Sequence, residues 1–182
     1  MGFLLLAQLA LSGAARAAPA RIEVVDVRGA LTAGGNTLVR GEIIDGSSPV
    51  ELAAGGEATL RLEQGLVLLK GPASFTADRD ALALRSGSLL SVLKKLKRRW
   101  SVKTPAAVAA VRGTTFYVEA RPEETYVCLC EGKLALSSPG REGVAHVAAK
   151  HHTAWIIKDG ARTKSTMLGH TDAEIAALKA RL

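Results

Sequence analysis

The sequence predicts an all-β fold, a solenoid or sandwich of short strands, with one short helix at the C-terminus. From Ile22 onward, apolar and polar residues alternate with a period of two in one short segment after another, as in half-buried strands. Glycines separate these segments roughly every ten residues, where the chain must turn. No helical spacing of apolar residues occurs before the final segment.

The expected strands differ in length but share this alternation. In chain order they are IEVVDV (22–27), TLVRGEII (37–44), PVELA (49–53), ATLRLEQG (58–65), LVLLKG (66–71), ALALRSGSLLSVL (81–93), WSVKT (100–104), TTFYVEA (114–120), TYVCLCEGKLALS (125–137) and AHVAA (145–149). Trp155, in the later stretch TAWII, is expected to anchor a core or an interface.

The final segment, GHTDAEIAALKARL, predicts a helix over 172–182. Thr171 can cap it, and Glu174, three residues later, completes a capping box. Ile175, Leu178 and Leu182 would share one face, so the helix is expected to fold back onto the sheet.

Length and charge limit the classes of protein and partner. A chain of 182 residues is long enough for one domain with a sizeable core. Its net charge of +7 favours acidic partners such as nucleic acid, anionic lipid or an acidic protein surface. The charge alone does not select among them.

The N-terminus predicts export. The uncharged apolar run GFLLLAQLALSGAA ends in small residues, and Ala15 and Ala17 can form a signal peptidase site, which predicts a signal peptide over residues 1–17. The alternative is an N-terminal membrane anchor, but the run is shorter than the ~20 residues that a spanning helix needs. Export to the periplasm argues against nucleic acid as the partner. The expected organisation is this signal peptide, a β domain over 22–160 and a C-terminal extension over 161–182.

One stretch, SVKTPAAVAAVRGTTFYVEARPEETYVCLCEGKLAL, resembles the FecR domain family. The resemblance rests on Thr-Pro, Val-Arg-Gly-Thr and Glu-Gly motifs between apolar strands, and it extends over about 27 to 160. The signature positions, to which it assigns fold roles, are Thr104, Pro105, Arg112, Gly113, Thr114 and Gly132.

The resemblance implies an extracytoplasmic β-rich module, often described as solenoid-like. The best-known members pass a signal from an outer-membrane iron–siderophore receptor to a sigma factor. For this chain the resemblance implies a sensor, binding or scaffold module of the cell envelope, with a protein or envelope ligand as partner. An alternative is a part of an anti-sigma type, iron-responsive signalling system.

The chain has two cysteines, Cys128 and Cys130, and they share one face of an expected strand. The family pattern turns Val127 and Leu129 inward, so core packing is not the obvious reason for the cysteines. A disulfide between them is awkward, because alternate residues of an extended strand are poorly placed for one. Two thiolates on one face can instead bind one soft or borderline metal ion.

Imidazoles follow the cysteines in the sequence. His151 and His152 lie in AAKHHTAWI, and His170 lies in LGHTD. A subset of FecR-like proteins looks similar across this stretch, with Cys-x-Cys, His-His and Gly-His-Thr-Asp. The candidate ligands are therefore Cys128, Cys130, His151, His152 and His170, for zinc, iron or copper. Redox-active or dimer-linking cysteines and purely structural thiols remain alternatives.

A basic stretch, LKKLKRRW, is the other candidate binding feature. Its charges could contact an anionic membrane surface, and the alternative is a solvated turn. They are Lys94, Lys95, Lys97, Arg98 and Arg99.

Motifs for catalysis are not found: there is no Gly-x-Ser-x-Gly elbow, no phosphate-binding glycine loop and no HExxH helix. The sequence therefore favours a protein that is not an enzyme. An envelope metalloprotein with redox or hydrolytic activity is the alternative.

Overall fold

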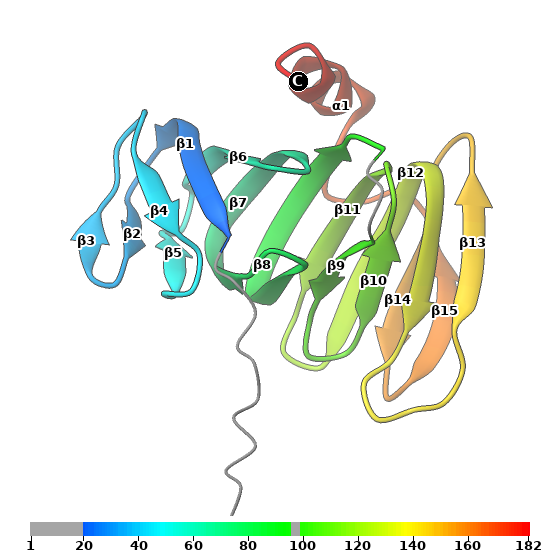
Figure 1. The fold of residues 1–182 in the computed structure, drawn as a ribbon. Helices are drawn as coiled ribbons and strands as arrows, with labels where there is room; N and C mark the ends of the chain where they lie inside the picture. The colour runs from blue at the N-terminus through cyan, green and yellow to red at the C-terminus, as the bar shows by residue number, and fades with distance from the viewer. Residues whose placement is uncertain (1–19, 96–98) are drawn as a thin grey trace, which may run out of the picture.

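The computed structural model describes residues 20–95 and 99–182 and confirms the all-β prediction with one short C-terminal helix (Figure 1). The expected signal peptide and the basic residues Lys97 and Arg98 lie outside the described residues. The strands, which form one connected sheet, are β1 (Arg21–Arg28), β2 (Leu31–Ala33), β3 (Asn36–Thr37), β4 (Ile43–Asp45), β5 (Val50–Leu52), β6 (Glu57–Leu62), β7 (Gly65–Ala77), β8 (Ala81–Leu93), β9 (Trp100–Lys103), β10 (Val108–Val111), β11 (Thr115–Ala120), β12 (Glu124–Ser137), β13 (Ala145–Ala149), β14 (Thr153–Lys158) and β15 (Ala161–Ser165).

Three long strands, β7, β8 and β12, each pair with different neighbours along their two halves. The first half of β12 pairs with β11 and β14, and its second half, from Gly132, pairs with β10 and β13. Likewise, β8 pairs with β11 from Gly87 onward and with β9 at its start. The long strands thus join two sets of strands, one containing β1, β6, β11, β14 and β15 and the other containing β2, β3, β5, β9, β10 and β13.

The larger hydrophobic core takes side chains from both sets of strands. Phe116 and Val127 come from the first set, and Phe75 and Leu84 come from the halves of β7 and β8 that belong to the second. Because side chains alternate along a strand, the opposite face of the first set carries a separate apolar cluster. We call this opposite face the outer face.

The outer face is covered by α1 (Asp172–Lys179), which lies above β7 and β8 in Figure 1. Thr171 caps the helix and forms the predicted capping box with Glu174. Ile175 and Leu178 are buried in the outer cluster. The helix begins where predicted, but it ends at Lys179 rather than at Leu182, and Leu182 is 37% exposed.

Most of the family signature residues lie in the turns on either side of β10, and Gly132 lies within β12. Gly113 has a φ of 69°, which L side chains rarely adopt. Thr114 Oγ1 donates to the Lys133 carbonyl oxygen at 2.8 Å, which ties this turn to β12. Thr104 Oγ1 accepts from the Ala107 N–H at 2.9 Å. These contacts agree with fold roles for the motif.

The structure corrects the expected strands in several places. It adds β2 and β14, and it extends the expected strand 66–71 to Ala77 in β7. The segment 37–44, expected as one strand, is interrupted, because residues 38–42 form a loop between β3 and β4. The strand β10 was not predicted, since its small residues, VAAV, carry little alternation. The strand β15 lies in the expected C-terminal extension and is mostly exposed, so it lacks the apolar half of the pattern.

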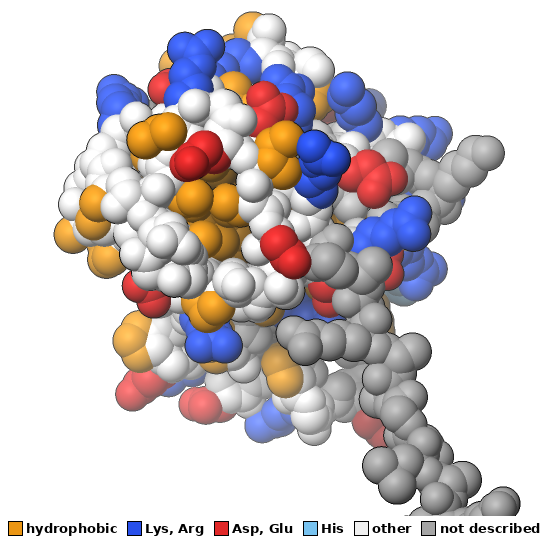
Figure 2. Space-filling model, turned by 60° about the vertical axis from the view of Figure 1, so that its left-hand side comes forward, with side chains coloured by type: hydrophobic (Ala, Val, Ile, Leu, Met, Phe, Trp, Pro, Cys, Tyr) orange, Lys and Arg blue, Asp and Glu red, His pale blue; other side chains and the backbone are white. Residues whose placement is uncertain are grey.

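Basic and acidic residues are mixed on the face of the molecule near β2–β5. Figure 2, with the β2–β5 end turned forward, shows basic and acidic side chains interspersed, with apolar side chains between them. The positive charge is therefore not gathered into one basic patch on this face. Within the described ranges, no helix has the length and apolar character needed to cross a membrane.

Candidate metal centre

Cys128 and Cys130 lie in the first half of β12 and point to the outer face, as the sequence predicts. Both belong to the outer cluster, and both are buried, with exposed fractions of 0% and 5%. Both are free thiols. The cysteines are therefore packed between the sheet and the chain that crosses over it, and not on an open surface.

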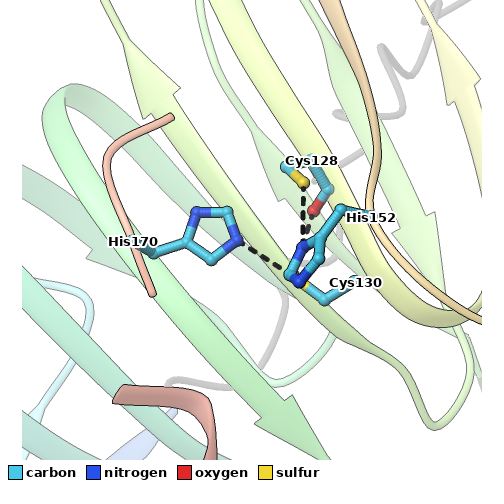
Figure 3. A group of neighbouring side chains, drawn as sticks. All are labelled: Cys128, Cys130, His152 and His170. Atoms are coloured by element: carbon cyan, nitrogen blue, oxygen red, sulfur yellow. Dashed lines mark hydrogen bonds between the residues drawn. The ribbon is translucent and has the colours of Figure 1, made fainter. Parts of the chain in front are cut away.

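The register between β12 and β14 brings one histidine to these cysteines. Cys128 pairs with Ala154 and Leu129 pairs with Thr153. One step further, His152 comes opposite Cys130, and residues opposite each other in an antiparallel pair share a face. His152 Nδ1 lies 3.6 Å from Cys128 Sγ (Figure 3).

The other histidine, His170, arrives on the segment that precedes α1. This segment is held by the Tyr126 hydroxyl, which donates to the Thr166 carbonyl oxygen and accepts from the Leu168 N–H, both at 2.8 Å. The His170 ring stacks on Tyr117 with ring centres 4.7 Å apart, and its Nε2 lies 3.2 Å from Cys130 Sγ. His170 is 5% exposed, so the sheet and the segment enclose it.

In its neutral form, each histidine would direct a nitrogen without a proton toward the sulfurs, as a metal ligand must. His170 Nδ1 lies 2.9 Å from the Leu168 carbonyl oxygen, which can only accept, so Nδ1 carries the proton. His152 Nε2 lies 2.8 Å from Asp172 Oδ1, and the carboxylate again requires a donor. Such outer partners commonly fix the tautomer and orientation of histidines that bind metals. Nε2 of His170 and Nδ1 of His152 are thereby left to act as ligands.

The four donor atoms lie close enough together to surround one metal ion. The sulfurs and ring nitrogens of Cys128, Cys130, His152 and His170 all lie within 4.8 Å of one another. A tetrahedral ion with bonds of about 2.3 Å to sulfur and about 2.0 Å to nitrogen would hold sulfur and nitrogen about 3.5 Å apart. The two short sulfur–nitrogen distances, 3.2 and 3.6 Å, bracket this value. The residues therefore fit a metal ion bound by two thiolates and two imidazoles.

The electrostatics of the group favour one thiolate. Hydrogen bonding with the Cys130 thiol, and then with His170 and His152, lowers the pKa of Cys128 to about 4, although burial opposes this shift. The neighbouring Cys128 sulfur and burial raise the pKa of Cys130. The directions of these two pKa shifts indicate that the pair holds one thiolate and one thiol. Burial also raises the pKa of Tyr117 to about 12, so its ring stays neutral beside His170.

Other residues singled out from the sequence lie elsewhere. His151 is exposed and is not one of the four clustered donors. Lys94, Lys95 and Arg99 are exposed, which suits either a solvated turn or contact with an anionic surface. Trp155 is partly buried and packs against the larger core.

Two contributors to the site were missed in the sequence. Asp172 is the first residue of α1 and was considered only as the end of the Gly-His-Thr-Asp motif, not as a partner of His152, to which it bonds. Tyr117 lies in β11, next to β12, and was considered only as a strand residue. Its position follows from the pairing of Tyr117 with Cys128, because paired residues share a face.

Comparisons with known proteins agree with this architecture. The profile of a family described as FecR protein matches residues 44–135. A crystal structure of a proposed anti-sigma factor from Parabacteroides distasonis ATCC 8503 superposes with a TM-score of 0.56 at 18% sequence identity, over 65% of this chain and 59% of that chain. At that identity the likeness concerns the fold alone. No curated protein matches the sequence.

The matched family region contains only half of the candidate metal centre. Cys128 and Cys130 fall inside residues 44–135, whereas His152 and His170 lie beyond them. The matched region therefore supplies the thiols, and the part of the chain after it supplies the imidazoles.

Proposed function

This chain belongs to the FecR protein family, and from that premise we propose that it is an exported, non-enzymatic envelope module that binds one transition metal ion. In this proposal the module acts as a sensor or scaffold and contacts a protein partner of an envelope signalling system. The partner class is proposed from the family and from the anti-sigma factor with a similar fold.

A single observation carries the metal-binding part of the proposal. Two buried thiols and two imidazoles with fixed tautomers converge within 4.8 Å. A set of two sulfurs and two nitrogens in a tetrahedral arrangement is typical of zinc, and hard ions such as magnesium or calcium prefer oxygen ligands. We therefore propose zinc as the ion, ahead of iron and copper.

The same donor set favours a structural or sensory ion over a catalytic one. Catalytic zinc sites usually have three protein ligands and leave the fourth position to water or substrate. Here four protein donors, Cys128, Cys130, His152 and His170, would complete the coordination of a tetrahedral ion. A redox or hydrolytic metalloprotein is accordingly the less favoured function.

The metal content of untagged protein tests this proposal. We expect one equivalent of zinc per chain in elemental analysis after purification without chelators, and less than about a tenth of that in the Cys128→Ser, Cys130→Ser variant, because thiolates are the stronger ligands of the set. The His146→Ala variant is the control, since His146 is exposed on β13, away from the four donors. Equal metal content in the wild type and the cysteine variant would remove the metal site from the proposal.

Export can be tested separately. We propose that residues 1–17 direct the chain to the periplasm, because their apolar run ends in a small-residue cleavage pattern. Fractionation of cells that produce the untagged chain is expected to show it in the periplasmic extract, with a mass that lacks these residues. Uncleaved chain retained in the cytoplasm would contradict the exported location while leaving the metal site unaffected.

A further inference from the structure

The segment 166–182 connects the candidate metal centre to the cover of the outer face. It carries His170 and then α1, whose Ile175 and Leu178 are its buried apolar side chains. Beneath it lie Leu66, Leu90, Val92, Tyr117 and Tyr126, all at most 4% exposed. If this segment left the sheet, a contiguous apolar surface with two tyrosines and two cysteines would be uncovered.

Contacts other than the candidate ligands also hold this segment. The Tyr126 hydroxyl bonds to Thr166 and Leu168, and Lys70 Nζ donates to the Gly169 carbonyl oxygen at 3.1 Å. The ion pairs that α1 and the residues after it form with the strands are near the surface: Lys70 Nζ to Glu174 Oε1 at 2.5 Å, Lys179 Nζ to Glu131 Oε2 at 2.6 Å and Arg181 Nη2 to Asp26 Oδ2 at 3.9 Å. Pairs of this kind contribute little to stability. The helix is also shorter than helices that are stable in isolation, so it depends on packing against the sheet.

Packing beneath the helix is incomplete. A pocket of about 260 Å³ that opens to solvent lies between α1 and the neighbouring strands β1, β6 and β7, lined by Leu68, Ala177, Leu178, Thr59 and five charged residues. Solvent, rather than apolar side chains, therefore lies against this side of the helix. The apolar contact of the helix is therefore limited on this side, in contrast to the fully buried strands below it.

The candidate ligands, in contrast, cross-link this segment to the sheet. Cys128 and Cys130 belong to β12, His152 lies just before β14, and His170 belongs to the segment itself. Asp172, which orients His152, is the first residue of α1. A metal ion bound by all four donors would thus connect the segment to β12 at the point where α1 begins.

We propose that the metal ion is a removable clasp that keeps the segment 166–182 on the outer face. This inference rests on the proposed function, because it requires the metal site to be occupied. Metal loss detaches the segment and α1 with it, and it uncovers the apolar surface around Tyr117 and Tyr126. The clasp couples the availability of the ion to the exposure of this surface, and so makes the module responsive to metal.

Hydrogen exchange measured by mass spectrometry on the full untagged chain tests the clasp. With zinc bound, amides of residues 166–182 are expected to be protected, and removal of zinc by a chelator is expected to speed their exchange by at least about tenfold. Strands of the larger core, such as β6 and the first half of β7, should keep their protection. The His170→Ala variant in the presence of zinc should resemble the chelated wild type in this segment, whereas His146→Ala should not.

Metal content is measured on the same samples, so that two failures can be told apart. If zinc is bound but protection of 166–182 is the same with and without it, the clasp is wrong and the metal site remains. If no zinc is bound under any condition, both the metal site and the clasp are wrong. Loss of protection throughout the chain on chelation would also overturn the clasp, because the ion would then stabilise the whole fold.

Discussion

Replacing Gly87 with alanine is expected to lower the free energy of unfolding by about 2–5 kcal/mol, the sum of a left-handed backbone cost and an overpacking cost. Gly87 has a φ of 87° at the point in β8 where pairing with β11 begins. A Cβ there would lie 2.4 Å from the Pro72 carbonyl oxygen and 2.6 Å from the Ala73 Cα. Those atoms belong to the backbone of β7, so they cannot move aside without disturbing the sheet.

Gly35 provides the matched control for this experiment. Its φ is 84°, close to that of Gly87, but a Cβ at Gly35 would meet no atom within 4 Å. Gly35→Ala should therefore show only the backbone cost, about 1–2 kcal/mol. Urea denaturation followed by circular dichroism measures both variants. Equal destabilisation of the two would mean that the close approach of β7 and β8 at Gly87 is not important for stability.

The second large effect is expected at His152, one of two adjacent histidines. His152→Ala should weaken zinc binding by at least about 100-fold, because loss of a ligand should cost no less than the 10–100-fold typical of an outer-shell residue. Asp172→Asn should weaken it by about 10–100-fold, since Asp172 only orients His152. Competition against a chromophoric zinc chelator measures these affinities.

His151→Ala is the matched comparison, because the two histidines are neighbours and differ in their placement. His151 comes opposite Glu131 when the β12–β14 register is continued, and it is exposed, whereas His152 comes opposite Cys130. The His151 variant should bind zinc as the wild type does. If His151→Ala and His152→Ala weaken binding equally, the register-based choice between them is wrong.

Alternation in the sequence identified most strands, because a half-buried strand needs apolar residues on one face only. Alternation did not identify strands whose two faces differ little in polarity. The strand β15, ARTKS, is mostly exposed, and the residues of β10, VAAV, differ little in polarity. The segment TLVRGEII alternates well enough to resemble a strand, but Gly41 has a φ of 91° and lies within the turn that interrupts it.

The capping box at Thr171 and Glu174 was predicted correctly because it depends on residues only three positions apart. The end of the helix was not predicted correctly, because Leu182 has the right periodicity although the last turn has changed its hydrogen bonds. The N–H groups of Arg181 and Leu182 donate to carbonyl oxygens three residues back, instead of four as in an α-helix.

For the candidate metal centre, the sequence by itself determined that Cys128 and Cys130 share one face, because strand geometry places alternate side chains together. It also supplied the histidines, but it could not choose between His151 and His152. Only the tertiary structure made that choice, through the register of β12 with β14 and the path of the segment that carries His170. The physical reason is separation along the chain: Cys130 and His170 are 40 residues apart, and such contacts depend on how the whole sheet pairs rather than on any local pattern.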